Sequence, residues 1–359
     1  MTPEFWRGRR VLLTGHTGFK GAWLALWLSR MGAQVTGLSL APESRPNLWD
    51  LLALDTVDSR IGTITDAALV QRVMDEAAPE VVLHLAAQAL VRRSYRDPME
   101  TFATNVLGTV SVLQAAAKTP SVQSVVVVSS DKCYENLERD EPYAEADRMG
   151  GRDPYSASKG CTELACASMR ASFFAPYAAG GHPARVGSGR AGNVIGGGDW
   201  SEDRLIPDVV RGCLGDAGAV TLRSPASIRP WQHVLEPLWG YLLLAEHLAA
   251  GTPGADSGWN FGPDAADERP VGAVAQAVVG ALGQGRIDID PAGASLHEAR
   301  ILRLDSARAR ALGWSPRLNF DETVRLTAEW YGAWARGASP RALCEGQLDH
   351  YQSLIGGSA

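Results

Sequence analysis

Short apolar segments alternate with longer amphipathic ones along the first half of the chain, and this alternation restricts the possible folds most. The segments typical of buried strands are 10–15 (RVLLTG), 34–40 (QVTGLSL), 80–87 (EVVLHLAA) and 124–128 (SVVVV). The segments that predict helices are 21–33, 66–79, 97–118 and 156–177. Strands and helices that alternate in this way form a parallel sheet with helices on both faces. The sequence therefore predicts an α/β fold with a doubly wound parallel sheet.

The second half of the chain is less regular. After a glycine-rich loop at 192–200, it shows helical patterns near 204–214, late in 229–251, and at 271–283 and 321–335, with a short strand at 258–263. No internal repeat or low-complexity segment is visible. We expect a smaller C-terminal α/β lobe that begins near residue 190.

Composition excludes several classes of protein. The 359 residues carry a net charge of −6 without a basic stripe, which argues against nucleic-acid binding. The five cysteines are scattered and form no CxxC pair, so we expect reduced thiols and no metal site. The N-terminus lacks an apolar signal core, and no run of 18 uncharged apolar residues is present. These features predict a cytoplasmic protein without a membrane span.

Three glycines, Gly15, Gly18 and Gly21, follow the first predicted strand at the spacing GxxGxxG. The first permits a tight turn, the second lets the backbone approach a diphosphate, and the third lets the helix pack on the strand. The helix N-terminus adds free N–H groups for the phosphates. This arrangement predicts a Rossmann-type dinucleotide cradle made of Gly15, His16, Thr17, Gly18, Phe19, Lys20 and Gly21. Ser39 stands where NAD usually meets an acidic residue, so the residues leave NAD and NADP open.

Tyr155 and Lys159 in "YSASK" are four residues apart and therefore lie on one face of a predicted helix. A phenol with a pKa near 10 is a poor base at neutral pH, but a neighbouring ammonium favours the phenolate and lowers that pKa. Beside a nicotinamide, such a tyrosine takes the proton of an alcohol while the hydride leaves. We therefore expect Tyr155 and Lys159 to be catalytic.

Together with the glycine turn and Ser130 at the end of a strand, this pair resembles the extended short-chain dehydrogenases/reductases, which act mainly on nucleotide sugars. Longer motifs are similar to the CDP-glucose 4,6-dehydratase family, namely "HLAAQALVRRSYRDP", "SSDKCYEN", "DPYSASKGCTEL", "RAGNVIGGGDW" and "RPWQHVLEPLWGYLLLAE". The similarity runs from about residue 8 to 335. It implies an NAD-dependent lyase that converts CDP-glucose to CDP-4-keto-6-deoxyglucose, in deoxysugar and lipopolysaccharide O-antigen biosynthesis.

The resemblance also implies which residues hold the cofactor. Besides the glycine turn these are Thr63, Ile64, Leu85, Ala86, Ala87, Gln88, Asn105, Tyr155 and Lys159. Two features depart from the family: Thr63 replaces the usual Asp, and 184–193 is richer in glycine than the usual strand. We expect residues 1–190 to form the NAD-binding domain, completed by elements near 230–262. Residues 191–229 and 263–359 are expected to form the substrate-binding lobe.

Asp131 and Lys132 directly follow the strand 124–128, as an acid and a base side by side. Dehydratases of this type oxidise the sugar at C4, eliminate water across C5–C6 and return the hydride to C6. Elimination needs an acid for the 6-hydroxyl and a base for the C5 proton, which predicts this pair as catalytic with Ser130. By resemblance Asp131 is the acid. Lys132 is either a neutral base or a cation that stabilises the enolate.

A nucleotide-sugar diphosphate needs cationic donors, and guanidinium groups bind phosphate in a bidentate manner. The residues predicted to bind the substrate are Ser94, Asn193, Arg204, Arg229 and Trp231. Two alternatives remain: a nucleotide-sugar 4-epimerase on the same scaffold, and a dinucleotide-sensing protein without catalysis. The pair Asp131 and Lys132 favours the dehydratase over the epimerase, and Tyr155 with Lys159 argues against a mere sensor.

The helices 97–118 and 156–177 carry apolar residues on more than one face. These are Phe102, Val106, Val110 and Leu113 in the first helix and Leu164, Met169, Phe173 and Phe174 in the second. A helix that covers a sheet needs only one apolar stripe, so a second stripe predicts another buried surface. We expect a homodimer or homotetramer assembled through a four-helix interface. The open alternative is that these residues only fill the space above their own sheet.

Overall fold

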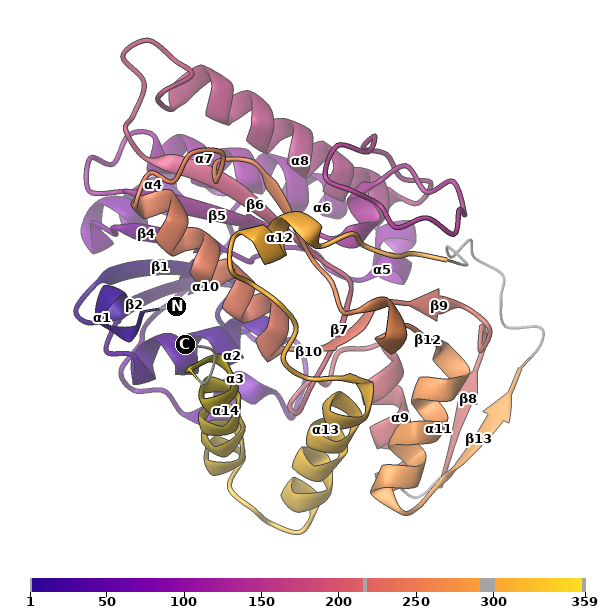
Figure 1. The fold of residues 1–359 in the computed structure, drawn as a ribbon. Helices are drawn as coiled ribbons and strands as arrows, with labels where there is room; N and C mark the ends of the chain where they lie inside the picture. The colour runs from indigo at the N-terminus through magenta and orange to yellow at the C-terminus, as the bar shows by residue number, and fades with distance from the viewer. Residues whose placement is uncertain (1, 216–217, 291–300, 357–359) are drawn as a thin grey trace.

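The computed structural model describes residues 2–215, 218–290 and 301–356. Its centre is a seven-stranded sheet in the order β11-β6-β5-β4-β1-β2-β3, with all neighbours parallel (Figure 1). Its strands are β1 (Arg10–Thr14), β2 (Gln34–Ser39), β3 (Asp58–Ile61), β4 (Val81–His84), β5 (Ser124–Val128), β6 (Arg185–Ala191) and β11 (Gly258–Phe261). The strand order reverses between β1 and β4, where ligands bind in such folds. The predicted doubly wound sheet is confirmed.

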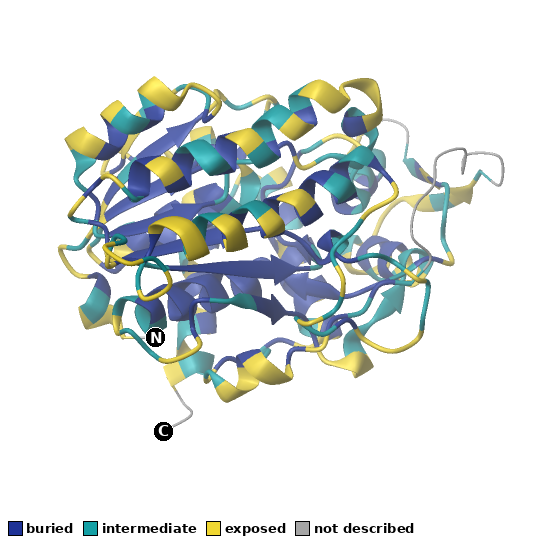
Figure 2. Cartoon of the chain, turned by 90° about the horizontal axis from the view of Figure 1, so that it is seen from above, coloured by how far each residue is buried: buried dark blue, intermediate teal, exposed yellow. Residues whose placement is uncertain are grey.

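Helices cover both faces of this sheet. On one face lie α2 (Phe19–Arg30) and α10 (Leu235–Ala249), and on the other α4 (Ala67–Ala77), α7 (Thr109–Ala116) and α8 (Pro154–Phe173). Successive strand residues alternate between two cores: Val11 and Leu13 pack with α2 and α10, whereas Leu12 packs with α4 and α7. Figure 2 shows the result, with buried strands below helices whose outer faces are exposed.

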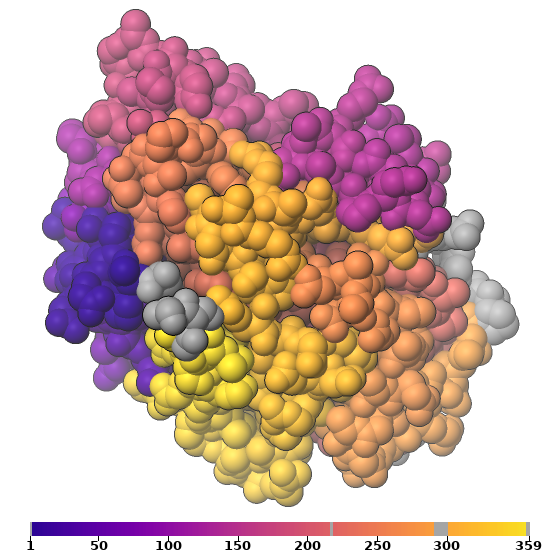
Figure 3. Space-filling view, viewed as in Figure 1, coloured from indigo at the N-terminus to yellow at the C-terminus, as the bar shows by residue number. Residues whose placement is uncertain are grey.

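The second half adds small two-stranded sheets and helices beside the carboxyl ends of the main sheet (Figure 1). Its strands are β7 (Asn193–Ile195), β8 (Ala219–Leu222), β9 (Ile228–Arg229), β10 (Trp231–His233), β12 (Arg269–Pro270) and β13 (Arg286–Ile289). Its helices are α9 (Leu205–Leu214), α11 (Val271–Leu282), α12 (Ala307–Ala311), α13 (Phe320–Ala335) and α14 (Pro340–Gly356). In Figure 3 the gold residues that lead from α12 to α13 lie between the surfaces of α10 and α11.

The glycine-rich segment for which a strand was in doubt forms β6, between β5 and β11. Its glycines have a packing role. A Cβ on Gly189 would lie 2.7 Å from the ring of Tyr241, and one on Gly187 would lie 3.2 Å from Leu248. Both partners belong to α10, so the missing side chains let this helix approach the sheet closely.

The predicted helix 97–118 is not continuous. It consists of α6 (Pro98–Phe102), a π-helical turn (Ala103–Gly108) and α7. In this wider turn the carbonyl of Asn105 accepts hydrogen bonds from the hydroxyls of Thr109 and Thr162, at 2.7 and 2.8 Å. Sequence periodicity does not reveal such a turn, because one of the hydroxyls that bonds the freed carbonyl, that of Thr162, comes from another helix.

The long helix α14 was not predicted, and neither were several short elements: α1 (Pro3–Trp6), α3 (Leu48–Leu52), α5 (Val91–Arg96) and β3. The predicted second apolar stripe is correct only in part. Leu113 and Phe174 are fully buried in their own core and so belong to the inner face, whereas Leu164 and Phe173 are exposed. All five cysteines are free thiols, and only Cys161 is exposed. No helix among the described residues is long and apolar enough to cross a membrane.

Candidate active site

The glycine turn joins β1 to α2 with little room for side chains. Gly15 has a φ of 79°, and a Cβ there would lie 2.8 Å from the backbone nitrogen of Ala86. A Cβ on Gly21 would lie 2.0 Å from the carbonyl oxygen of Gly15. Gly18 is the N-cap of α2 and offers no side chain to its first turn. The free N–H groups at this helix end and the bare turn fit a dinucleotide diphosphate.

Side chains of the turn anchor it to the neighbouring strands. Thr17 Oγ1 lies 2.7 Å from Ser39 Oγ and donates to the carbonyl of Leu40 at 2.8 Å. His16 Nε2 lies 2.7 Å from Ser59 Oγ, and burial lowers the pKa of His16 to about 4, so this imidazole is neutral. His16 and Thr17 therefore fix the shape of the cradle rather than its charge.

The loop after β4 is held against the same turn. The backbone N–H of Ala86 donates to Thr14 Oγ1 at 3.2 Å. Gln88 donates its backbone N–H to Asn105 Oδ1 at 2.8 Å, and Asn105 Nδ2 donates to Ser158 Oγ at 2.8 Å. Asn105 thus connects the loop of Leu85, Ala86, Ala87 and Gln88 to α8. Both ends of its amide are used within the protein, which indicates a positioning role.

The other two residues predicted at the cofactor, Thr63 and Ile64, follow β3. The Thr63 hydroxyl lies 2.8 Å from that of Thr65 on the surface. Ile64 is buried, and a Cβ on Gly108 would lie 2.6 Å from it. The structure therefore places Ile64 against the π-helical turn.

Tyr155 and Lys159 occupy the first two turns of α8, and both are buried. Burial raises the pKa of Tyr155 to about 12, even though a hydrogen bond with Ser130 and the charge of Arg204 oppose the rise. Burial lowers the pKa of Lys159 to about 8, and its Nζ lies 3.4 Å from the carbonyl of Val128. The expectation of a lowered pKa at Tyr155 is wrong for this structure, because desolvation outweighs the nearby cations.

Asp131 and Lys132 lie in a 3₁₀ turn, η2 (Asp131–Cys133), directly after Ser130. Ser130 Oγ donates to Asp131 Oδ1 at 2.8 Å and accepts from the backbone N–H of Lys132 at 3.2 Å. Burial raises the pKa of Asp131, although Lys132, Ser130, Arg229 and Lys20 act in the opposite direction. Its Oδ2 has no hydrogen-bond partner within the described chain. A buried carboxyl with a raised pKa suits a proton donor.

Lys20 extends from the glycine turn toward the same cluster. Burial lowers its pKa to about 7, the cations Arg204 and Lys159 lower it further, and the carboxylates Asp131 and Asp199 oppose this. The sequence placed Lys20 only among the phosphate-cradle residues. The structure adds that its ammonium lies within electrostatic reach of Asp131 and Lys159.

A buried ion pair behind the cluster was not predicted. Arg190 on β6 donates to Glu163 of α8 at 2.8 Å and to the hydroxyl of Tyr134 at 2.7 Å. Glu163 also accepts hydrogen bonds from Ser129 and from Ser188. The network therefore fixes the strand end and the turn on either side of Ser130. An arginine between Gly189 and Ala191, inside the otherwise uncharged segment 186–191, was the signal available in the sequence.

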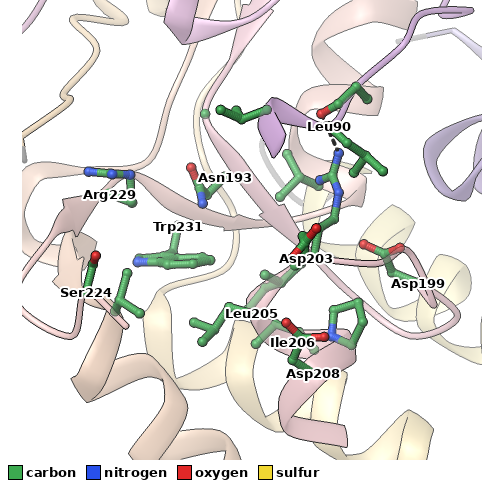
Figure 4. A pocket seen from close by; sticks show the side chains of 18 of the residues that line it. Leu90, Asn193, Asp199, Asp203, Leu205, Ile206, Asp208, Ser224, Arg229 and Trp231 are labelled. Carbon is green, nitrogen blue, oxygen red and sulfur yellow. Dashed lines mark hydrogen bonds between the residues drawn. The ribbon is translucent and has the colours of Figure 1, made fainter. Parts of the chain in front are cut away.

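One cavity connects these groups to the second half of the chain (Figure 4). Ser130, Asp131, Lys132 and Tyr155 line one part of it, and α9 and β8 line another. The predicted substrate residues Asn193, Arg204, Arg229 and Trp231 all line its wall.

The side chains of these wall residues are held differently. Arg204 Nη2 donates to the carbonyl of Ala89 at 3.4 Å, and Arg229 Nη1 to that of Ile228 at 2.9 Å. Trp231 Nε1 donates to the carbonyl of Arg269 at 3.0 Å. Ser94 does not line the described cavity: its hydroxyl donates to Val91 and accepts from the backbone N–H of Tyr155. Ser94 therefore contacts the start of α8, and its substrate role stays a prediction.

The strand order, the glycine turn at β1, and Tyr155 with Lys159 beside Ser130 define an extended short-chain dehydrogenase/reductase.

Comparisons with known proteins narrow this class. The family model described as GDP-mannose 4,6 dehydratase matches residues 12–327. CDP-glucose 4,6-dehydratase of Salmonella typhimurium is 44% identical over 98% of both chains. UDP-glucose 4-epimerase of Mycolicibacterium smegmatis is 30% identical over 90% of this chain and 98% of its own. A dTDP-glucose 4,6-dehydratase from Streptomyces venezuelae, solved with NAD bound, has a TM-score of 0.75 at 26% identity, covering 90% of this chain and 96% of its own.

The chain belongs to the sugar-nucleotide 4,6-dehydratases, and among them to the CDP-glucose 4,6-dehydratase family. Asp131 and Lys132 line the same cavity as Tyr155.

Proposed function

We propose that the protein is an NAD-dependent lyase that converts CDP-glucose to CDP-4-keto-6-deoxyglucose and water. The observation that carries this proposal is that one cavity is lined by Tyr155 and by the adjacent Asp131 and Lys132. Oxidation at C4 needs only the tyrosine, whereas loss of water across C5–C6 needs a further acid and base. The 44% identity to a CDP-glucose 4,6-dehydratase supports the same conclusion.

The cofactor cradle comprises the glycine turn from Gly15 to Gly21 and the loop after β4. Bound NAD supplies a hydride acceptor for C4 of the sugar and the same hydride for C6. Because the hydride returns, a complete cycle consumes no NAD. The solved dTDP-glucose 4,6-dehydratase with NAD bound supports NAD, and the neutral His16 and Ser39 add no cation of the kind that a 2′-phosphate needs.

The protein's own residues move three protons. Because burial raises the pKa of Tyr155 to about 12, Tyr155, hydrogen-bonded to Ser130, removes the proton of the 4-hydroxyl only as the phenolate, a form that the positive charge of Lys159 on the same helix face favours. The resulting 4-ketone acidifies the C5 proton, which Lys132 removes in its neutral form. In the alternative in which Lys132 is a cation that stabilises the enolate, a water molecule takes the C5 proton. Asp131, protonated because burial raises its pKa, gives its proton to the departing 6-hydroxyl, which leaves as water. The double bond between C5 and C6 would then take the hydride at C6 from the bound cofactor, while the group that removed the C5 proton, after exchange with solvent, would return a proton to C5.

The substrate-binding lobe is proposed to comprise residues 191–229 and 263–359, next to an NAD-binding domain of residues 1–190 completed near 230–262. Arg204 and Arg229 are the proposed diphosphate ligands, and Asn193, Trp231 and Ser94 complete the substrate set. C-terminal helix α14 also contacts the first domain, since the rings of Tyr351 and Trp27 pack edge to face.

The competing function is 4-epimerisation, favoured by similarity to the UDP-glucose 4-epimerase. Such an epimerase needs C4 oxidation and reduction on either face but no acid and base at C5 and C6. Burial of Asp131 with a raised pKa favours the dehydratase. A sensor without catalysis would have no use for this pair.

The test is the position of solvent deuterium in the product. Wild-type protein incubated with CDP-glucose in D₂O is expected to give CDP-4-keto-6-deoxyglucose with deuterium at C5, detected by NMR. Lys132→Ala is expected to retain C4 oxidation, seen as cofactor reduction, and to slow product formation roughly 100-fold or more. The matched control Tyr155→Phe is expected to stop before cofactor reduction. Formation of CDP-galactose alone would refute the dehydratase assignment.

We further propose that the protein is cytoplasmic, acts in deoxysugar biosynthesis for the O-antigen, and forms a homodimer through α6, α7 and α8. The support for the dimer is a set of exposed apolar side chains on α6, on α8 and on the π-helical turn between α6 and α7. They are Met99, Phe102, Leu107, Leu164 and Phe173. Apolar residues gathered on neighbouring helices mark a protein interface more often than scattered ones do.

A further inference from the structure

The cavity has two chemically different parts. The catalytic part contains Asp131 and Tyr155, and a Cβ on Gly192 would lie only 3.2 Å from Asp131 Oδ2. From there the wall continues through Asn193, which pairs with Trp231 in the register of β7 and β10. The other part is built from α9, β8 and the start of α11, and most of its side chains are apolar. They are Leu205, Ile206, Val220, Leu222 and Val271.

This geometry orders the parts of a nucleotide sugar along the cavity. Its hexose must reach Tyr155 and Asp131, so the nucleoside extends away from them along the wall. Arg204 links the two parts of the wall, because it lines the cavity as the N-cap of α9 and its charge acts on Tyr155 in the catalytic part. An apolar part beyond the cations suits a flat base and its ribose.

Asp208 is the carboxylate of α9 in that part. Its backbone N–H donates to the carbonyl of Arg204 at 3.0 Å, so the two residues are one helical turn apart on the same face. Figure 4 shows Asp208 beside Ile206 on α9, among the residues that line the cavity. The Asp208 side chain is 35% exposed, and burial raises its pKa.

Asp208 is held in a fixed orientation by Arg211. Arg211 Nη2 donates to Asp208 Oδ1 at 2.6 Å, while its Nη1 donates to the carbonyl of Trp200 at 2.9 Å. Within the described residues no hydrogen bond reaches Oδ2 of Asp208. The neighbouring Asp203, on the segment before α9, faces two arginines through its Oδ1, Arg92 at 3.7 Å and Arg223 at 3.4 Å. Asp208 pairs with one arginine through Oδ1 and lies next to the apolar side chains of α9, so its Oδ2 is an acceptor for a ligand in the apolar part.

We propose that Asp208 determines the nucleobase by accepting a hydrogen bond from the exocyclic amino group of cytosine. This inference rests on the proposed function and adds the residue that selects CDP substrates. Cytosine presents an N4 amino donor where uracil and thymine present an O4 acceptor. A carboxylate attracts the first and repels the second, and a buried polar group left unpaired is costly. The same geometry disfavours UDP- and dTDP-sugars.

The experiment measures base recognition separately from catalysis. Isothermal titration calorimetry of the purified protein with CDP and with UDP gives both affinities without any reaction. Wild type is expected to prefer CDP by at least about 10-fold, and Asp208→Asn to reduce that ratio roughly 10- to 100-fold. Asparagine offers both a donor and an acceptor, so UDP binding should improve as CDP binding weakens. Turnover of CDP-, UDP- and dTDP-glucose is expected to shift in the same direction.

The controls separate the possible results. The matched control is Glu202→Gln, a carboxylate just before α9. Glu202 pairs with Arg96, and neither residue lines the cavity, so this variant should leave the ratio of CDP to UDP affinity unchanged. Asp208→Glu keeps the charge but displaces the carboxylate oxygens by one methylene, so it should also weaken the preference for CDP over UDP. Melting temperatures establish that each variant is folded. Equal losses for CDP and UDP would assign Asp208 to the ribose and overturn the inference, as would a wild type without preference.

The two proposals fail in different ways. If no CDP-sugar is dehydrated but the preference for CDP depends on Asp208, only the proposed function is lost. If CDP-glucose is dehydrated but Asp208→Asn keeps the wild-type preference, only this inference is lost.

Discussion

Asp131 and Glu236 are buried carboxyl groups whose surroundings serve different purposes. Asp131 faces the cavity, and its Oδ2 has no partner in the described chain. Glu236 on α10 has its acceptors occupied: Oε1 accepts the backbone N–H of Leu318 at 2.7 Å, and Oε2 accepts the hydroxyl of Tyr351 at 2.7 Å. An occupied buried carboxyl fixes structure, here by holding the segment before α13 and helix α14 to α10.

Glu236 predicts a pH dependence of stability. Burial raises its pKa to about 7, above its ordinary value of 4.5, so the folded state binds this proton more tightly than the unfolded state. The free energy of unfolding should therefore fall as pH rises from about 4.5 to 7, by on the order of 3 kcal/mol at most. Glu236→Gln keeps the acceptor for Leu318 and removes the titration. Denaturant unfolding at pH 5 and pH 8 should show a smaller drop for this variant, and equal drops in both proteins would contradict the assignment.

At the residue scale, the sequence predicted those groups whose chemistry follows from local spacing. Tyr155 and Lys159 are one helical turn apart, and Asp131 and Lys132 are adjacent, so their proximity needed no tertiary structure. Sequence alone did not predict the pKa of Tyr155, because that value depends on burial by distant segments. Asp208 was missed for the same reason, since α9 reaches the cavity only through the packing of the second half.

At the element scale, β5, β6 and α8 meet around the ion pair of Arg190 and Glu163. Apolar periodicity predicted β5 and α8 but not the glycine-rich β6, and a charge in a strand gives no indication of its partner. Both side chains are buried: that of Arg190 is 6% exposed and that of Glu163 is 5% exposed. Removing one member of such a pair leaves an uncompensated buried charge.

The Arg190→Met variant tests this coupling of elements. Loss of the cation is expected to destabilise the protein by about 3–5 kcal/mol, because Glu163 then stays buried without its partner. The double variant with Glu163→Gln should recover part of this loss, since the isolated charge is gone. Thermal and denaturant unfolding of the three proteins gives the comparison. If the double variant is no more stable than Arg190→Met, the pair is not the source of the effect.

At the scale of the whole molecule, the helices α6, α7 and α8 cover the sheet and still expose large apolar side chains. Leu107 and Leu164 are 63% and 60% exposed, whereas Leu113 on the neighbouring turn is fully buried. One helix layer thus has an inner face that completes the core and an outer face without a partner in the chain as described. The sequence predicted two apolar stripes but did not separate inner from outer residues, because short helices with a π-helical turn shift the periodicity.

The final prediction concerns assembly through this outer face. A two-fold interface would bring the same helices of two subunits together, so each substitution acts twice. Leu107→Glu combined with Leu164→Glu is expected to convert a dimer into a monomer of 38.3 kDa, because four carboxylates would enter the interface. Ile289→Glu, on β13 and 62% exposed, is the matched control and should leave the mass unchanged. Light scattering at micromolar concentration decides: a wild-type mass of one chain would remove the basis for this interface.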